Sequence, residues 1–247
     1  MFLFRSCGLR KSVLVTTQNV QIRDLCSSAT KGAKFERGCL ETLSNFNFHL
    51  QQCGGAGDKG VDLIGVWQLV PTSQLLEKLS IINTNDTLPN INFINPISWP
   101  LVNTVIQCKH EKIKCKPSYV RELDGVLSRF NSQSSTEIFI PTTRQSSLNT
   151  LAIPPIKIPL IGFLICSSSF SPGCLTALHS SLNPIILMIV EPVEEKESFE
   201  LGYIQLNSKA RFYLPNLVAG KKYSSTSSLP AVALLNNNID LTTLKNV

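Results

Sequence analysis

The chain has 247 residues, enough for one sizeable domain or two small ones, and its hydrophobic content of 43% can supply a packed core. This composition excludes wholesale disorder, and no apolar run reaches the roughly 18–20 residues that a membrane-spanning helix needs. The formal charge of +6 suits a polyanionic partner, although basic proteins of other kinds are common. The eight cysteines include no CxxC pair, so a structural zinc site has no support and free thiols are the simpler account.

The N-terminal segment carries cations at Arg5, Arg10, Lys11 and Arg23 and no acid before Asp24. Apolar and hydroxyl-bearing residues are interleaved with these cations. An acid-free leader of this kind is typical of a mitochondrial transit peptide, which we predict over residues 1–32, with the mitochondrial matrix as destination. A disordered basic tail is the alternative interpretation.

After the leader, apolar residues recur every three to four positions and predict an amphipathic helix over residues 33–46. A short strand at Phe48–Leu50 and a glycine-dense turn at 54–60 precede a buried strand at Val61–Trp67. Residues 71–100 are rich in Asn, Thr, Ser and Pro, which indicates an insertion that is partly loop.

The rest of the predicted domain alternates strands and helices. In chain order, we expect strands at Val102–His110, Ile138–Pro141, Ile158–Ser167 and Pro184–Val190, with helices at Pro117–Phe130 and Ser171–Ser181. This order predicts an α/β fold, a single domain over residues 33–190 with a mixed sheet flanked by helices. Residues 191–247 then form a C-terminal extension with one short element near Leu201–Leu217 and a Ser-rich, mobile stretch at 221–228.

Four polar residues in this apolar framework are candidates for a functional site. Asp62 lies in an apolar strand, where a carboxylate is costly to bury unless a cation or hydrogen-bond donors satisfy it. Gln107 and Lys109 are two residues apart in the next long strand, so they share one of its faces. Glu36 lies on the first helix beside the apolar stripe, within possible reach of the sheet. Taken singly, each has a structural explanation, such as a paired acid or a solvated helix face.

Together these residues match the needs of phosphodiester hydrolysis, which uses a hard cation to activate water and offset charge on the phosphate oxygens. Magnesium prefers oxygen ligands, with one or two carboxylates from the protein. Asp62, Glu36 and Gln107 would supply such oxygens, and Lys109 would orient the water or stabilise the developing charge. We therefore predict that these four residues are catalytic, with Mg²⁺ as cofactor and Mn²⁺ as a possible substitute.

Four further cations follow the candidate site directly, at Lys112, Lys114, Lys116 and Arg121. As a basic edge they would neutralise phosphates that flank the scissile bond, which predicts DNA as the partner. A solvated charged loop is the alternative. Few aromatic residues are interleaved there, which argues against recognition of single strands by base stacking.

The segments GAGDKGVDLIG and VIQCKH, residues 55–65 and 105–110, resemble the Mrr-like branch of the PD-(D/E)XK nucleases. The resemblance covers about residues 33–190 and implies a restriction-endonuclease-like fold. It also implies that Asp62 and the Gln-x-Lys pair are catalytic and that the first helix contributes a further acid. The sequence departs from the family pattern where Val61 replaces the proline, and in the long stretch between Asp62 and Gln107.

With its basic leader, the whole chain also resembles fungal mitochondrial proteins required for respiratory growth, which implies a role in supporting that growth. Two classes of function follow. The chain is a magnesium-dependent nuclease acting on mitochondrial DNA, including a structure-specific resolving or repair enzyme, or it is a non-catalytic nucleic-acid-binding or scaffolding protein for mitochondrial genome maintenance. The acid beside a buried lysine favours catalysis, because a mere binder has no need of that pair.

The leader gives a first testable prediction. A reporter fused to residues 1–32 should enter mitochondria, because a cationic, acid-free leader responds to the membrane potential. Fluorescence microscopy of the fusion checks this. A diffuse cytosolic signal from the fusion, with the full-length protein also excluded from mitochondria, would reject it.

Overall fold

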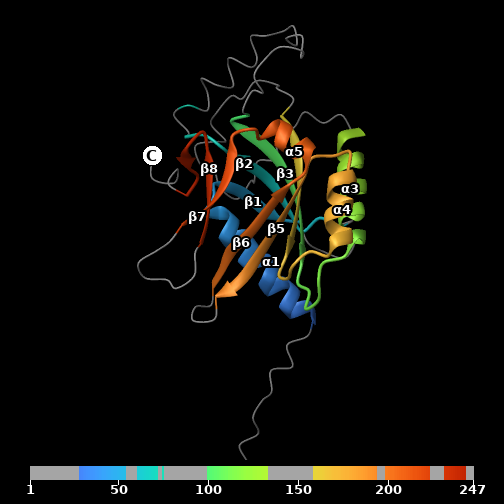
Figure 1. Cartoon of the computed structure of the whole chain (residues 1–247). Helices are drawn as coiled ribbons and strands as arrows, with labels where there is room; N and C mark the ends of the chain where they lie inside the picture. Colours follow the sequence, from blue (N-terminus) through green and yellow to red (C-terminus); the bar gives the residue numbers. More distant parts are fainter. Residues whose placement is uncertain are drawn as a thin grey trace, which may run out of the picture.

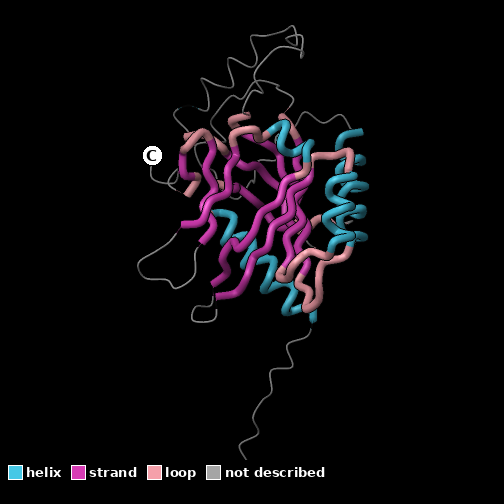
Figure 2. The backbone as a smooth tube through the Cα atoms, in the orientation of Figure 1, coloured by secondary structure: helices cyan, strands magenta, loops and turns pink. Residues whose placement is uncertain are grey.

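The structure, a computed structural model, describes residues 28–53, 60–71, 74, 99–132, 158–193, 198–222 and 231–242. Its centre is a six-stranded mixed sheet flanked by helices, which confirms the predicted α/β fold (Figures 1 and 2). The strands lie in chain order across the sheet: β1 (Phe48–Gln52), β2 (Leu63–Gln68), β3 (Leu101–Lys109), β4 (Leu160–Cys166), β5 (Ile185–Val193) and β6 (Ser198–Leu206). β1, β2 and β3 pair antiparallel, β3, β4 and β5 pair parallel, and β6 returns antiparallel to β5.

Helices cover both faces of the sheet, because each carries an apolar stripe that must be buried. On one face, α1 (Ser28–Ser44) buries Phe35, Cys39 and Leu43 in one core with side chains of β2, β3 and β4. On the other face, α3 (Pro117–Ser132) and α4 (Pro172–Ser180) close a second core (Figure 1). The helices expected from the three- to four-residue spacing are therefore confirmed.

An aromatic cluster anchors the first core. Phe48 and Trp67 are paired residues of β1 and β2, and their rings stack with centroids 4.5 Å apart. Phe163 of β4 meets both rings edge-on. The Trp67 indole N–H donates to the Phe46 carbonyl at 2.9 Å, so the polar end of this buried ring is satisfied.

The helix after β4 begins and ends where the sequence predicts. Ser171 is its N-cap, and its hydroxyl accepts the backbone N–H of Cys174. Pro172 occupies the first helical position, where its missing N–H costs nothing. Ser181 is the C-cap, and its N–H donates to the Leu178 carbonyl.

The segment expected as a C-terminal extension continues the fold. Within it, β6 adds the sixth strand of the central sheet, and Thr42 of α1 donates its hydroxyl to the Phe199 carbonyl at 2.9 Å. After α5 (Ser208–Tyr213), a three-stranded sheet forms from β7 (Leu217–Lys222), β8 (Ala231–Asn236) and β9 (Ile239–Asp240). The Asn236 amide donates to the Leu69 carbonyl at 2.9 Å, which ties this small sheet to the end of β2.

Several predicted segments lie outside the described residues. These are the leader up to residue 27, the glycine turn at 54–59, most of the 71–100 insertion, the strand at Ile138–Pro141, and most of the Ser-rich stretch. Among the helices that the structure describes, none is long and apolar enough to cross a membrane. No disulfide joins the six cysteines in the described parts of the chain.

The pairing of β1 with β2 gives a stability prediction at Gly65. A Cβ atom at Gly65 would lie 2.0 Å from the backbone oxygen of His49, which cannot move without breaking the pairing. Gly65→Ala should therefore lower the melting temperature strongly. Gly125→Ala is the matched control: its Cβ would meet nothing within 4 Å, and alanine in a helix should stabilise by about 0.5–1 kcal/mol. Thermal unfolding of both variants measures this, and equal melting temperatures would contradict it.

Candidate active site

Asp62 is fixed at the entrance to β2 by hydrogen bonds to both neighbouring strands. Its backbone N–H donates to the Ile106 carbonyl at 2.9 Å, and its own carbonyl accepts the N–H of Cys53 at 2.9 Å. Its carboxylate Oδ2 accepts the backbone N–H of Cys108 at 2.6 Å, a short charge-assisted bond. The half-buried carboxylate is thereby held against β3, beside the peptide that links Gln107 to Cys108.

Gln107 and Lys109 face α3, on one side of the sheet. Val105 of the same strand packs in the α3-side core, and Cys108 packs in the α1-side core. Alternation therefore directs Gln107 and Lys109 toward α3. The Lys109 Nζ atom lies 5.2 Å from the ring centre of Tyr119 on α3, in agreement with this placement.

Gln107 is fully buried, yet neither its amide oxygen nor its amide nitrogen has a hydrogen-bond partner among the described residues. A buried polar group without a partner costs about 1–3 kcal/mol. Such groups are rare in folded proteins and point to a ligand, an ion or water that satisfies them.

Glu36 lies on the other side of β3 from Gln107. The Gln52 side chain donates to the Glu36 carboxylate at 3.5 Å. The pKa of the Cys108 thiol is raised, first by its hydrogen bond with Cys39 and then by burial, and the charges of Asp62 and Glu36 raise it further. The charges of Glu36 and Asp62 thus both act on Cys108, and Glu36 lies on the face of β3 opposite Gln107 and Lys109.

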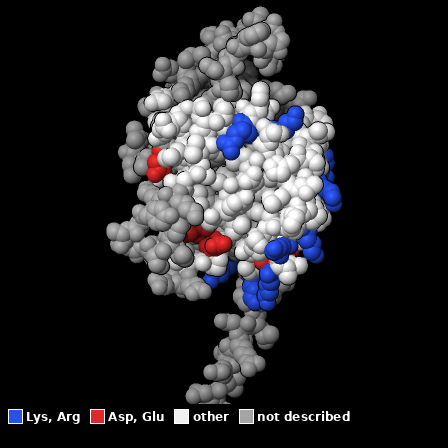
Figure 3. All heavy atoms as spheres, viewed as in Figure 1, with Lys and Arg blue, Asp and Glu red and all other residues white. Residues whose placement is uncertain are grey.

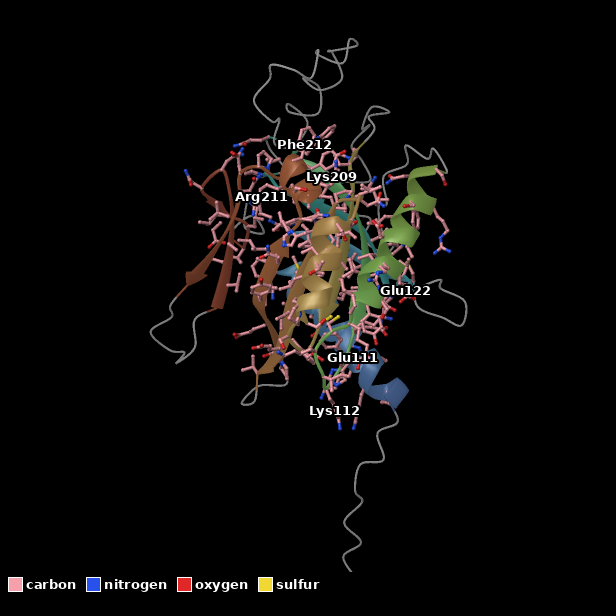
Figure 4. All side chains as sticks on the ribbon, turned by 45° about the vertical axis from the view of Figure 1, so that its right-hand side comes forward. Glu111, Lys112, Glu122, Lys209, Arg211 and Phe212 are labelled. Carbon is pink, nitrogen blue, oxygen red and sulfur yellow. The ribbon has the colours of Figure 1, made fainter. Side chains whose placement is uncertain are left out.

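A further acid, Glu122 of α3, reaches the Gln107 side of the sheet. Gly60 has a positive φ of 80°, and a Cβ there would lie 3.0 Å from Glu122 Oε1 and 3.1 Å from Gln107 Nε2. Glu122 Oε1 and Gln107 Nε2 are therefore separated by no more than the sum of these two distances. The sequence does not mark Glu122, because an acid next to Arg121 on the polar side of a helix is typical of a solvated face (Figure 4).

Lys109 is positioned by a small network. Tyr119, whose ring lies beside the ammonium group, donates its hydroxyl to the Glu111 carboxylate. This hydrogen bond, with burial as a smaller cause, raises the pKa of Tyr119 to about 12. The Glu111 backbone N–H donates to the Ser167 hydroxyl at 3.0 Å, which joins the network to the end of β4. The lysine amine is therefore held near the site instead of extending freely into solvent.

The basic loop, residues 111–116, rests on the β4–α4 connection. Cys115 donates its N–H to the Ser169 carbonyl at 2.8 Å, and Ser168 donates its hydroxyl to the Ile113 carbonyl at 2.6 Å. The predicted DNA-binding cations here and on α3 are all exposed: Lys112, Lys114, Lys116 and Arg121. Figure 3 shows several Lys and Arg side chains at the lower end of the molecule. Figure 4 shows Lys112 projecting at that end, beyond Glu111.

The donor chemistry of these residues fits a hard cation. Asp62 and Glu122 offer carboxylate oxygens, and Gln107 offers a buried amide oxygen without a partner in the described structure. Magnesium takes ligands of this kind. No group of three or more His, Cys, Asp or Glu side chains that could hold a metal occurs among the described residues, so a site here would use the amide or water as well.

Comparisons with known proteins give a mitochondrial relative and a family match. Among curated proteins, the chain is 25% identical over 209 residues to the "Uncharacterized protein C824.03c, mitochondrial" of Schizosaccharomyces pombe (strain 972 / ATCC 24843), covering 85% of this chain and 63% of that protein. The chain thus spans less than two thirds of that relative's length. No solved structure matches.

The sequence model of the family described as "Required for respiratory growth protein 7" matches residues 27–161, which include α1, β1–β3 and α3. All candidate site residues lie in this range. The family and the named relative support a mitochondrial location and a role in respiratory growth, as the sequence predicts. The chain belongs to the required for respiratory growth protein 7 family.

Proposed function

We propose that this chain is a Mg²⁺-dependent nuclease that acts on DNA in the mitochondrial matrix and thereby supports respiratory growth. The observations that carry the proposal are the Asp62 carboxylate, held at 2.6 Å from the Cys108 N–H, and the buried amide of the preceding residue, Gln107, which has no partner in the described structure. A fixed carboxylate and an unsatisfied amide oxygen are ligands of the kind that magnesium prefers.

The fold supports the resemblance to PD-(D/E)XK nucleases. The helix with Glu36, the strand preceded by Asp62 and the strand with Gln107 and Lys109 follow in the expected order. β2 and β3 are hydrogen-bonded neighbours, with Leu63 opposite Ile106, so the acid and the Gln-x-Lys pair meet despite the long connection between them. We therefore retain Asp62, Gln107 and Lys109 as the proposed catalytic residues, while Glu36 lies on the other face of β3 from Gln107 and Lys109.

In this proposal each residue has a separate task. Asp62 and Gln107 would hold the metal, which when bound lowers the pKa of water and offsets charge on the phosphate oxygens. Glu36, predicted from the sequence as a third ligand, lies on the other face of β3 from Gln107 and would not join them on one ion. Lys109, held beside Tyr119, would stabilise the negative charge that develops on the phosphate. The cations of the basic loop and Arg121 would hold the flanking phosphates.

The first mutational prediction concerns chemistry. Asp62→Asn keeps the shape and an acceptor for the Cys108 N–H but removes the ligand charge, so magnesium-dependent cleavage should fall on the order of a hundredfold or more. Lys109→Ala should abolish cleavage with little effect on DNA binding. Purified protein on linear, nicked and branched DNA, with and without magnesium, measures both effects. Lys209→Ala, at the opposite end of the molecule in Figure 4, is the control that should cleave normally.

Two results would contradict this assignment. If Asp62→Asn cleaves as well as wild type, any nuclease site lies elsewhere in the chain. If wild type binds every DNA form and cleaves none, the chain is instead a non-catalytic DNA-binding or scaffolding protein for mitochondrial genome maintenance.

Substitutions in the basic loop should have the opposite effect to Lys109→Ala, with weaker DNA binding and normal cleavage. Replacing Lys112, Lys114 and Lys116 together with alanine should weaken DNA binding and flatten its salt dependence, by a slope of about 0.9 for each lost phosphate contact. Cleavage at saturating DNA should be spared, because these cations lie outside the proposed metal site. Binding titrations at several salt concentrations measure the slope, again with Lys209→Ala as control. An unchanged slope would show that the loop is only a solvated surface.

A further inference from the structure

We infer that Glu122 of α3 is a carboxylate ligand of the metal site, on the side of the sheet that Gln107 faces. This inference rests on the proposed magnesium site. It adds an acid that neither the sequence pattern nor the family comparison marks, and it assigns that acid to a different helix from Glu36.

The position of Gly60 shows how close the two side chains come. A Cβ atom placed on Gly60 would lie 3.0 Å from Glu122 Oε1 and 3.1 Å from Gln107 Nε2. The positive φ of Gly60 lets the chain pass this point without a side chain. The carboxylate of Glu122 and the buried amide of Gln107 therefore approach each other across the backbone that leads into Asp62.

Both amide atoms of Gln107 are without a hydrogen-bond partner within the described structure. Glu122 is exposed at the surface of α3, so its carboxylate is open to an ion from solvent. The Glu122 carboxylate lies on the amide-nitrogen side of Gln107, and the Gln107 amide oxygen also has no partner in the described structure. Together with Asp62, two residues after Gly60, these groups supply oxygen ligands of the kind that a hard divalent cation takes. A cation would satisfy the buried Gln107 oxygen and would offset the repulsion between the two acids.

Glu36 does not fill the same place. It lies on α1, and its charge acts on Cys108, whose side chain points to the opposite face of β3 from Gln107. Glu36 on the α1 face of β3 and Glu122 on the α3 face are thus the two candidates for a second carboxylate ligand beside Asp62. Gln107, which has no partner in the described structure, faces α3 and therefore favours Glu122.

Metal binding by the full chain tests the inference directly. Mn²⁺ binding is measured by isothermal titration calorimetry for wild type, Glu122→Gln, Glu36→Gln and Glu41→Gln. Glu41 is an exposed acid of α1 outside the site, and its variant is the matched control. We expect Glu122→Gln to weaken Mn²⁺ binding at least tenfold, and Glu41→Gln to change it less than twofold.

A second measurement distinguishes metal binding by Glu122 from a purely structural role. Glutamine keeps an oxygen that can accept a hydrogen bond from Gln107, so the metal-free melting temperature of Glu122→Gln should equal that of wild type. A lowered melting temperature with unchanged Mn²⁺ affinity would overturn the inference in favour of a structural role for the Glu122 charge. Mn²⁺ binding that is absent in wild type, or that responds to Glu36→Gln and not to Glu122→Gln, would also overturn it.

Failure of the Glu122 inference can be distinguished from failure of the nuclease proposal. If Mn²⁺ binding depends on Glu122 but wild type cleaves no DNA, the metal site stands and the nuclease proposal fails. If wild type cleaves DNA in an Asp62-dependent way while Glu122→Gln binds Mn²⁺ and cleaves normally, the nuclease proposal stands and Glu122 is not a ligand.

Discussion

The hydrogen bond from the Cys108 N–H to the Asp62 carboxylate, at 2.6 Å, fixes the relation between the two strands that carry the candidate site. β3 is paired along its length with β2 on one edge and β4 on the other, so its backbone is among the most constrained parts of the molecule. The Asp62 carboxylate is hydrogen-bonded to that backbone and not to a surface loop. Groups held on rigid strands keep their mutual positions more closely than groups held on loops, which is what metal coordination requires.

This arrangement is costly for folding. The Gln107 amide has no partner in the part of the chain that the structure describes, which costs about 1–3 kcal/mol for each unsatisfied group, and net stabilities of domains are only about 5–15 kcal/mol. A hydrophobic residue at this position would be expected to stabilise the apoprotein. The presence of Gln107 in the core therefore favours a functional explanation over a structural one, since functional sites commonly sacrifice stability.

Sequence rules predicted those features that depend on neighbours along the chain. The stripe of Phe35, Cys39 and Leu43, the Ser171 cap and the shared face of Gln107 and Lys109 all follow from local periodicity. Glu122 was missed because its significance depends on Gly60, which lies far from it in the chain and meets it only in the folded sheet. β6 was missed as a strand of the central sheet for a similar reason: its pairing with β5 and its contact with α1 are set by tertiary structure.

The contact between α1 and β6 has a consequence for how the chain reaches this fold. Thr42 and Phe199, which share a hydrogen bond, are 157 residues apart, and the rings of Phe35 and Phe199 lie 5.9 Å apart. A topology that joins the first helix to the sixth strand has a high contact order, and such folds form slowly. During synthesis the part of α1 that contacts Phe199 must wait on the order of ten seconds for β6 to be made. Until then the nascent chain exposes that part of the helix, which makes it a substrate for chaperones and an aggregation hazard.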